Sequence, residues 1–261
     1  MAGSLIRLAN PEDAAALFAG WQETLIWSAL EGEMGCIWAV SGRPKAALCE
    51  TGDFLFLSGS PTEPETRLLL ECWAREKGRF EILAPRDAAC GALIEAVFGE
   101  KARAGKRCAF QKGSEHFDPA ALRRLVKAAP KQVSIVPFDR ALYHQALEQN
   151  WSKDFVSLFR NADDYLARGL GFAALSGGRL VGGASSYSRY SSGIEIQVET
   201  RSDWQRKGIA SACCAALILA CMERGLYPSW DAANPASAAL AQKLGYREAG
   251  LYPVWYMDSP K

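Results

Sequence analysis

The run Gln205-Arg206-Lys207-Gly208-Ile209-Ala210 has the residue types best suited to binding an anion. It lies between an alternating, strand-like stretch at 194–200 and an apolar run at 211–222 that is long enough for a helix. The first turn of a helix leaves N–H groups without intrahelical partners, and the helix dipole adds partial positive charge there. Gly208 lets an anion approach the backbone, and two cationic side chains precede it. The run therefore predicts a pyrophosphate-binding loop, with a solvated loop before a core helix as the alternative.

Two carboxylates lie four residues apart on the strand that leads into this loop. Glu195 and Glu199 fall on one face of a regular strand, with Gln197 between them. A row of acids on an otherwise apolar strand indicates a functional surface. The alternative is the solvent-facing side of an antiparallel strand, where such alternation is normal.

The composition is that of an ordinary globular protein. Of 261 residues, 49% are apolar and 23% charged, and a formal net charge of +1 gives no reason to expect nucleic-acid or membrane partners. The eight cysteines contain no CxxC pair, and two histidines cannot complete a zinc site, so we expect reduced core thiols, Cys213 and Cys214 among them, and no metal. The N-terminal stretch does not resemble a signal peptide, and no apolar run is long enough to span a bilayer. These features predict a soluble, cytoplasmic protein.

The elements that must position these residues divide into two halves, with the boundary at 128–132. The first half, 1–128, has the pattern of a mixed α/β domain and contains no anion-binding loop. We expect helices at 10–18, 22–30, 63–77, 88–98 and 119–127, and strands at 36–40, 46–50, 53–57, 80–83 and 107–111.

The second half, 132–261, has the order β–α–α–β–β–β–loop–α–β–α–β. We expect strands at 133–136, 171–175, 180–187, 193–200, 227–231 and within 246–257, and helices at 139–149, 155–168, 211–222 and 235–244. A Gly-containing hairpin joins the second and third of these strands.

This half resembles the GCN5-related N-acetyltransferase (GNAT) superfamily over roughly residues 133–257. One feature is the meander that ends in Ile194-Glu195-Ile196-Gln197-Val198. Another is the Gln/Arg-x-x-Gly-x-Gly/Ala loop, which Gln205, Gly208 and Ala210 satisfy. The last is Asn234 followed by Leu240 and Leu244-Gly245-Tyr246. The wording GASSYSRY…GIEIQVET…RGLYPSWDAAN is also similar to a small bacterial subfamily of two-part GNAT proteins with a divergent N-terminal half.

The resemblance implies an α+β (mixed α/β) architecture with two domains. The GNAT domain, 132–261, would have a central, splayed and mostly antiparallel sheet flanked by helices. The smaller α/β domain, 1–128, would be a substrate-binding wall, an oligomerisation surface or a degenerate GNAT-like copy. Whether the protein is a monomer or a homodimer stays open.

The resemblance further implies acetyl-CoA as the donor. The amides of 206–210 would hold its pyrophosphate, and the backbone of 198–200 would pair with pantetheine like an added strand. A gap between strands 194–200 and 227–231 would make room for the thioester. Asn234 would contact pantetheine, cap the helix after it, or do both. The implied cofactor-binding residues are Val198, Glu199, Thr200, Gln205, Arg206, Lys207, Gly208, Ile209, Ala210, Asn234 and Ser237.

Acetyl transfer to an amine needs a group that accepts a proton near the thioester. Glu195 stands about where family members with a glutamate base carry it. Asp231 would bind the cationic amine or help to deprotonate it, unless it is only a helix-start carboxylate. Ala241 replaces the tyrosine with which many members protonate the leaving thiolate. The general acid stays open among Tyr187, Tyr190, Ser237, water or no strong acid at all.

The acceptor pocket is expected at the polar end of strand 180–187 and the hairpin after it. Its candidate residues are Ser186, Tyr190 and Trp230, with a solvated turn and core packing as alternatives. The implied function is acetyl transfer to a primary amine of a small molecule, by direct attack in a ternary complex. The alternative is a CoA-binding sensor or scaffold with little catalytic activity. The sequence leaves the identity of the amine open among a polyamine, an amino-sugar antibiotic, an amino acid and a protein N-terminus.

Overall fold

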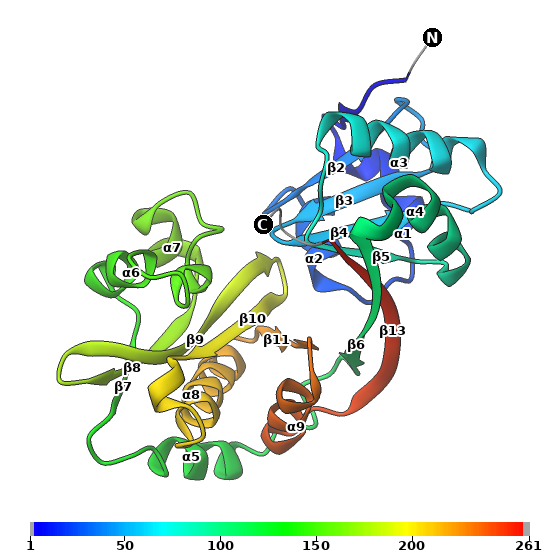
Figure 1. The fold of residues 1–261 in the computed structure, drawn as a ribbon. Coiled ribbons are helices and arrows are strands. Elements are labelled where there is room, and N and C mark those ends of the chain that lie inside the picture. Colours follow the sequence, from blue (N-terminus) through cyan, green and yellow to red (C-terminus); the bar gives the residue numbers. More distant parts are fainter. Residues whose placement is uncertain (1–2, 258–261) are drawn as a thin grey trace. The chain divides into compact units, whose positions relative to one another are not determined.

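The computed structural model describes residues 3–257, which form two compact units (Figure 1). Unit 1 comprises residues 3–107 and 251–257, and unit 2 comprises residues 108–250. The division falls inside the strands β6 (Ala102–Phe110) and β13 (Glu248–Met257), and not at 128–132, where the sequence suggested a boundary. The reason is that α5 (Pro119–Lys127) packs on α8 (Ile209–Glu223), which places it in unit 2.

Unit 1 is built on a sheet with the strand order β1-β2-β3-β4-β5-β13. Its neighbouring strands are antiparallel except β4 and β5, which pair in parallel from Phe54 with Ile82 to Leu57 with Pro85. The strands are β1 (Ile6–Arg7), β2 (Cys36–Ala39), β3 (Ala47–Thr51), β4 (Phe54–Ser58) and β5 (Ile82–Pro85). The helices are η1 (Pro11–Ala14), α1 (Ala15–Phe18), α2 (Thr24–Leu30), α3 (Pro64–Glu76), η2 (Ala88–Cys90), α4 (Gly91–Phe98) and η3 (Gly99–Lys101).

Unit 2 is built on a sheet with the order β11-β10-β9-β8-β7, antiparallel except for the β10–β11 pair. Figure 1 shows α8 on one side of this sheet and α6 and α7 on the other. The strands are β7 (Ser134–Pro137), β8 (Gly171–Ser176), β9 (Arg179–Tyr190), β10 (Gly193–Thr200), β11 (Tyr227–Ser229) and β12 (Asp231–Ala232). The helices besides α5 and α8 are α6 (Arg140–Leu147), η4 (Lys153–Phe155), α7 (Ala162–Arg168), η5 (Ser202–Trp204) and α9 (Pro235–Leu244).

The expected elements appear in the predicted order in both halves, while the short β1 was not predicted and two expected elements differ locally. The expected helix 155–168 is a short 3-10 turn, an irregular stretch and then α7, because Asn161 caps α7 by accepting the N–H of Asp164 at 3.0 Å. The expected strand 227–231 is broken at Trp230 into β11 and β12.

The two units repeat one order of elements. Besides α5 and the short β12 of unit 2, each has a strand, helices, three antiparallel strands, a helix, a strand parallel to the last one, a further helix and a final strand that continues into the other unit. This repetition favours the degenerate copy among the three alternatives for the first half.

Helix α8 is buried on nearly all sides, which explains its apolar sequence. Cys213, Cys214 and Cys221 lie in its buried part, as expected of core thiols. Burial raises the pKa of Cys213 and Cys221 to about 12 and that of Cys214 well above its usual value, so all three stay protonated near neutral pH. No helix within residues 3–257 is long and apolar enough to cross a bilayer.

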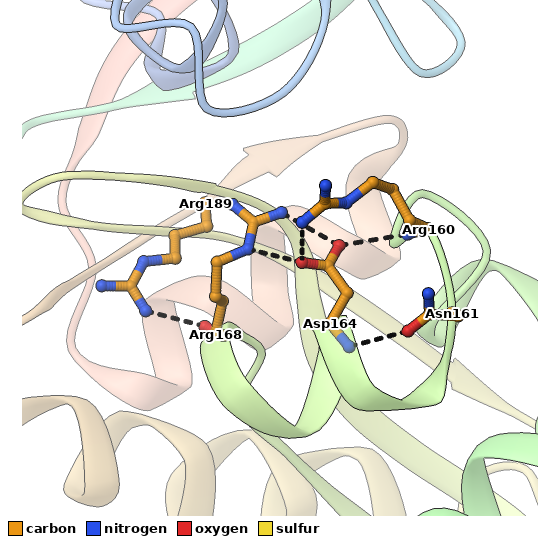
Figure 2. Close-up of polar contacts among 5 residues, drawn as sticks. All are labelled: Arg160, Asn161, Asp164, Arg168 and Arg189. Atoms are coloured by element: carbon orange, nitrogen blue, oxygen red, sulfur yellow. Dashed lines mark hydrogen bonds and ion pairs between the residues drawn. The ribbon is translucent and has the colours of Figure 1, made fainter.

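An ion-pair network fixes α7 to its surroundings (Figure 2). The Asp164 carboxylate, whose side chain is 5% exposed, accepts hydrogen bonds from Arg168 Nε and Arg160 Nη2, each at 2.9 Å. These two guanidinium groups, Arg168 first, hold the pKa of Asp164 well below its usual range. Arg189 of β9 donates to the backbone oxygen of Arg168 at 2.9 Å. The network thus connects both ends of α7 to the loop before it and to β9.

Candidate functional site

The parallel pair β10–β11 separates at Glu195. Its register runs from Gly193 with Tyr227 to Glu195 with Ser229. This last pair of facing residues is the rung of Glu195. Beyond it β10 continues to Thr200, whereas the chain after Ser229 enters β12, which pairs with β6. The gap expected between strands 194–200 and 227–231 is therefore present, and Glu195 lies where it begins.

The edge of β10 that faces this gap carries backbone groups available to a ligand. Arg201 N donates to Val181 O at 3.0 Å, so Thr200 and Val198 are in positions whose peptide groups point away from β9. Within residues 3–257 no strand pairs with that part of β10. The N–H of Thr200 instead donates to Glu199 Oε1 at 2.9 Å. An extended ligand can pair with this edge once the Glu199 carboxylate moves aside.

A β-bulge marks the same point on the other side of β10. Glu195 opposes Ser188, whereas Ile196 opposes Ser186, so Tyr187 is the extra residue on β9. Bulges increase local twist and redirect side chains. Tyr187 is buried at this bulge, close along the sheet to Glu195.

The loop before α8 has the backbone geometry of an anion site. Arg206 and Gly208 have left-handed φ angles of 61° and 83°. The first backbone hydrogen bond into α8 joins Ala212 N to Gly208 O at 3.1 Å, so the preceding amides lack intrahelical partners. No heavy atom lies within 4 Å of where a Cβ on Gly208 would stand. This open, N–H-rich loop fits a phosphate group.

The side chains of this loop differ in what they contact. Gln205 Nε2 donates to Thr200 O at 3.2 Å and so ties the loop to the end of β10. Lys207 Nζ donates to Asp203 O at 2.9 Å and lies 4.7 Å from the Trp204 ring centroid, which directs it back onto η5. Arg206 is exposed, and within the described residues no partner is recorded for its side chain. Arg206 is therefore the cationic side chain best able to reach an anion.

A buried hydroxyl group at this edge tests whether the expected acetyl-CoA donor fits the residues present. Thr200 Oγ1 is buried and, among residues 3–257, has no hydrogen-bond partner. It lies at the end of the open edge, immediately before the loop. A ligand that follows the edge into the loop can satisfy this oxygen, so the residues present fit a nucleotide-bearing thioester.

Asn234, Ser237 and Trp230 have clear structural roles. Asn234 Oδ1 caps α9 by accepting Ser237 N at 2.9 Å. Trp230 is 2% exposed, packs in the core against Tyr246, and donates from Nε1 to Ser237 Oγ at 3.2 Å. The expectation that Trp230 forms a wall of the acceptor pocket is corrected by this burial: the indole is a core side chain. The Ser237 hydroxyl is engaged by the same indole.

Glu195 is a buried acid, with an exposed fraction of 6%, so the alternative of a solvent-facing carboxylate is wrong for this residue. Its register partners Ser188 and Ser229 are buried as well, and register partners share one face of a sheet. The Ser188 hydroxyl has no hydrogen-bond partner within the described chain. After burial itself, the charge of Glu195 is the next cause of the raised pKa of Tyr227, and it contributes to that of Tyr246.

Lys112 lies beside these residues, which the sequence does not reveal. Its Nζ donates to Ser229 Oγ at 2.8 Å, and Tyr227 Oη donates to Gln111 O at 3.1 Å. The segment after β6 therefore runs beside β11 and brings an ammonium group to the rung of Glu195. Lys112 lies 117 residues from Ser229 along the chain and belongs to no motif, so no spacing signal could have found it.

The other expected acceptor and acid residues are mostly buried. Ser186 Oγ accepts the N–H of Leu170 at 3.0 Å, and Tyr190 is buried at the end of β9. Asp231 is half-buried on β12, opposite Ala109. Ala241 is fully buried in the core of unit 2, so this position does not present a side chain to solvent.

Unit 1 lacks a counterpart of the gap and the loop. Strands β4 and β5 stay paired to Leu57 and Pro85. Helix α3 begins after Glu63, whose Oε1 accepts the N–H of Glu65 at 3.5 Å, with Pro64 at its first position. A carboxylate at this helix start repels an anion, so the anion-binding geometry described above belongs to unit 2.

Comparisons with known proteins agree on one family. A sequence model of the GNAT acetyltransferase family matches residues 15–255. A Bacillus subtilis protein called uncharacterized N-acetyltransferase YdfB is 24% identical over 180 residues, which cover 68% of this chain and 66% of that protein, just under two thirds of its length. The crystal structure of a GCN5-related N-acetyltransferase-like protein from Streptococcus suis is 42% identical, with a TM-score of 0.87, over 95% of this chain and 98% of that one. A tandem GNAT protein from the clavulanic acid biosynthesis pathway, 15% identical over 99% of each chain with a TM-score of 0.58, shares the fold.

Proposed function

Because the chain belongs to the GNAT acetyltransferase family, we propose that it transfers the acetyl group of acetyl-CoA to a primary amine of a small molecule. In this proposal the amine attacks the thioester directly, in a ternary complex, and unit 2 carries the chemistry. Unit 1 is a degenerate copy of the same fold.

The donor is proposed to lie along β10 and to end in the loop before α8. The amides of residues 206–210 and the Arg206 side chain hold the pyrophosphate, and Thr200 Oγ1 adds a hydroxyl. The backbone of Val198 and Thr200 pairs with the amides of pantetheine. Asn234 contributes its side-chain amide while its oxygen caps α9. Five residues of β10, at roughly 3.3 Å each, carry the donor about 17 Å from Thr200 to the rung of Glu195.

The proposed reaction uses Glu195 as the general base. The amine nitrogen forms a bond to the acetyl carbon, the bond from that carbon to sulfur breaks, and CoA leaves as a thiolate. Glu195 accepts the proton that the nitrogen loses, directly or through a water. The thiolate takes up a proton from water or from a phenol, for which Tyr187 and Tyr190 are the candidates. Asp231 is proposed to attract the cationic amine before it is deprotonated.

The observation that carries this proposal is a buried carboxylate at the rung where β10 and β11 separate. We expect Glu195→Gln to lower kcat by about 10²- to 10⁴-fold, because the amide cannot accept the proton. Binding of acetyl-CoA should be unchanged. CoA release with a panel of amines and calorimetric titration with acetyl-CoA measure the two effects.

Glu223→Gln is the matched control, since Glu223 is an exposed acid at the far end of α8. It should keep the rate of the unaltered chain. A Glu195→Gln variant that turns over as fast as this control would remove Glu195 from the mechanism.

A second candidate function is a CoA-binding sensor or scaffold. Ala241 favours it, because a hydroxyl that could protonate the thiolate is missing at this buried position. Binding of acetyl-CoA without turnover of any amine in the panel would support the sensor and contradict the transferase.

A further inference from the structure

We propose that Lys112 binds a carboxylate of the acceptor, so that the acceptor is a zwitterion with its amine close to an acidic group. This inference rests on the acetyl transfer proposed above and defines the chemical class of the acceptor.

The ammonium group of Lys112 lies at the rung where the gap opens. Its Nζ donates to Ser229 Oγ at 2.8 Å, and Ser229 is the register partner of Glu195. Neighbouring strands are about 4.8 Å apart, and register partners project from the same face. Glu195 and the Lys112 ammonium group therefore lie at one rung of the sheet, on the same face.

Lys112 is half-buried, and the described part of the chain holds no counter-ion for it. Among residues 3–257, no carboxylate oxygen lies within 4.0 Å of Lys112 Nζ, the limit for an ion pair. An ammonium group has three N–H donors, and the one recorded bond uses a single donor on Ser229. A cation that has lost part of its hydration without gaining an anion is unfavourable. A carboxylate from the acceptor supplies that anion.

A second polar group at this rung points to a ligand. The Ser188 hydroxyl is fully buried and has no hydrogen-bond partner in the described chain. Ser188 is the other register partner of Glu195. Buried hydroxyl groups normally have partners, so this oxygen is available to an acceptor or to a water that accompanies it.

The anion that Lys112 attracts does not come from CoA. The loop that fits the pyrophosphate follows Thr200, five residues and about 17 Å along β10 from the rung of Glu195. A single ammonium beside a serine also suits the single charge of a carboxylate. Arginine, whose fork of donors can bind two oxygens at once, is the residue over-represented at phosphate sites. These points identify a carboxylate of the acceptor.

The test compares matched acceptors and matched variants of the full chain. The acceptors are the common amino acids, the amide and the decarboxylated amine of each, and phosphoethanolamine. We expect the best amino acid to exceed its own amide at least 10-fold in kcat/KM. Lys112→Met should raise the KM of that amino acid by about 10- to 100-fold, as for loss of a hydrogen bond to a charged group, and leave the amide unaffected. Lys131→Met removes an exposed lysine of unit 2 and should change neither the KM of the amino acid nor the reaction of its amide.

Ser229→Ala provides a second variant that keeps the ammonium and removes its anchor. It should raise the KM of the amino acid by a smaller factor, and it replaces Lys112→Met if that variant does not fold.

The outcomes separate the two proposals. Equal rates with acid and amide, or an unchanged KM in both variants, would overturn the role of Lys112 and leave acetyl transfer intact. Preference for phosphoethanolamine would overturn the carboxylate. Acetyl-CoA binding without turnover of any amine would overturn the transferase and this inference with it.

Discussion

At the scale of single residues, the site depends on a few groups that the backbone holds in place. Glu195 and Gly208 could be predicted from the sequence, because a strand pattern and a loop motif specify their positions. Lys112 could not, because the fold alone brings it to Ser229. The sequence also could not decide the role of Trp230. An aromatic side chain at the end of a strand suits the wall of an acceptor pocket and the hydrophobic core equally. Only its packing and its bond to Ser237 decide between them.

Gly208→Ala tests the loop at this scale. Gly208 has φ of 83°, where a Cβ costs about 1 kcal/mol, but no neighbour would clash with the new methyl group. We therefore expect a folded chain whose Kd for acetyl-CoA is about 10-fold higher, since the methyl group occupies the approach to the amides; each factor of ten is about 1.4 kcal/mol. Calorimetric titration measures the Kd. Gly177→Ala, at φ of 56° and equally open, is the control for backbone strain and should leave the Kd unchanged.

At the scale of elements, the order of strands and helices followed from hydrophobic periodicity and from the turn residues. The extent of the helix after α6 did not, because residues 155–168 have enough helical pattern for one continuous helix. Asn161 and the bonds to Asp164 start α7 at Ala162 instead. The break between β11 and β12 could not be predicted from the sequence either. It arises because β11 pairs with β10 whereas β12 pairs with β6.

Asp164→Asn tests the network around α7. At pH 7 we expect the variant to lose about 2 kcal/mol of unfolding free energy, because the hydrogen bonds from Arg160 and Arg168 then end on a neutral amide and not on a carboxylate. The pKa of Asp164 is lowered by folding, so its stabilisation is full above the unfolded value of about 4. It is lost as pH falls through the folded value. The difference between variant and unaltered chain should therefore shrink as the pH falls from about 5 towards 2.

Urea unfolding at several pH values measures this difference. Asp163→Asn is the control, because the side chain of Asp163 is 79% exposed where it pairs with Arg140, and such pairs contribute less than about 1 kcal/mol. A loss in Asp164→Asn that is equal at pH 3 and pH 7 would show that the charge of Asp164 does not stabilise the fold.

At the scale of the whole molecule, two units share one order of elements but differ where chemistry is possible. The strands β4 and β5 of unit 1 remain paired, and Glu63 occupies the start of α3. The strands β10 and β11 of unit 2 separate, and glycine precedes α8. The sequence suggested both halves and located the loop in the second. It placed the boundary at 128–132, because a stretch with a proline and a lysine resembles a linker. The sequence does not reveal that the helix before this stretch packs on the unit that follows.

In the proposed function each chain has one donor site, from which the acetyl group passes directly to an amine. Rapid mixing of the chain with acetyl-CoA, with and without an accepted amine, tests it when CoA and acetylated amine are quantified together. The cysteines of α8 are buried and protonated, so no covalent acetyl-thiol step is expected there. We expect no CoA release without amine, and equal amounts of CoA and acetylated amine when the amine is present. Release of CoA in the absence of amine, with the acetyl group retained on the chain, would contradict it.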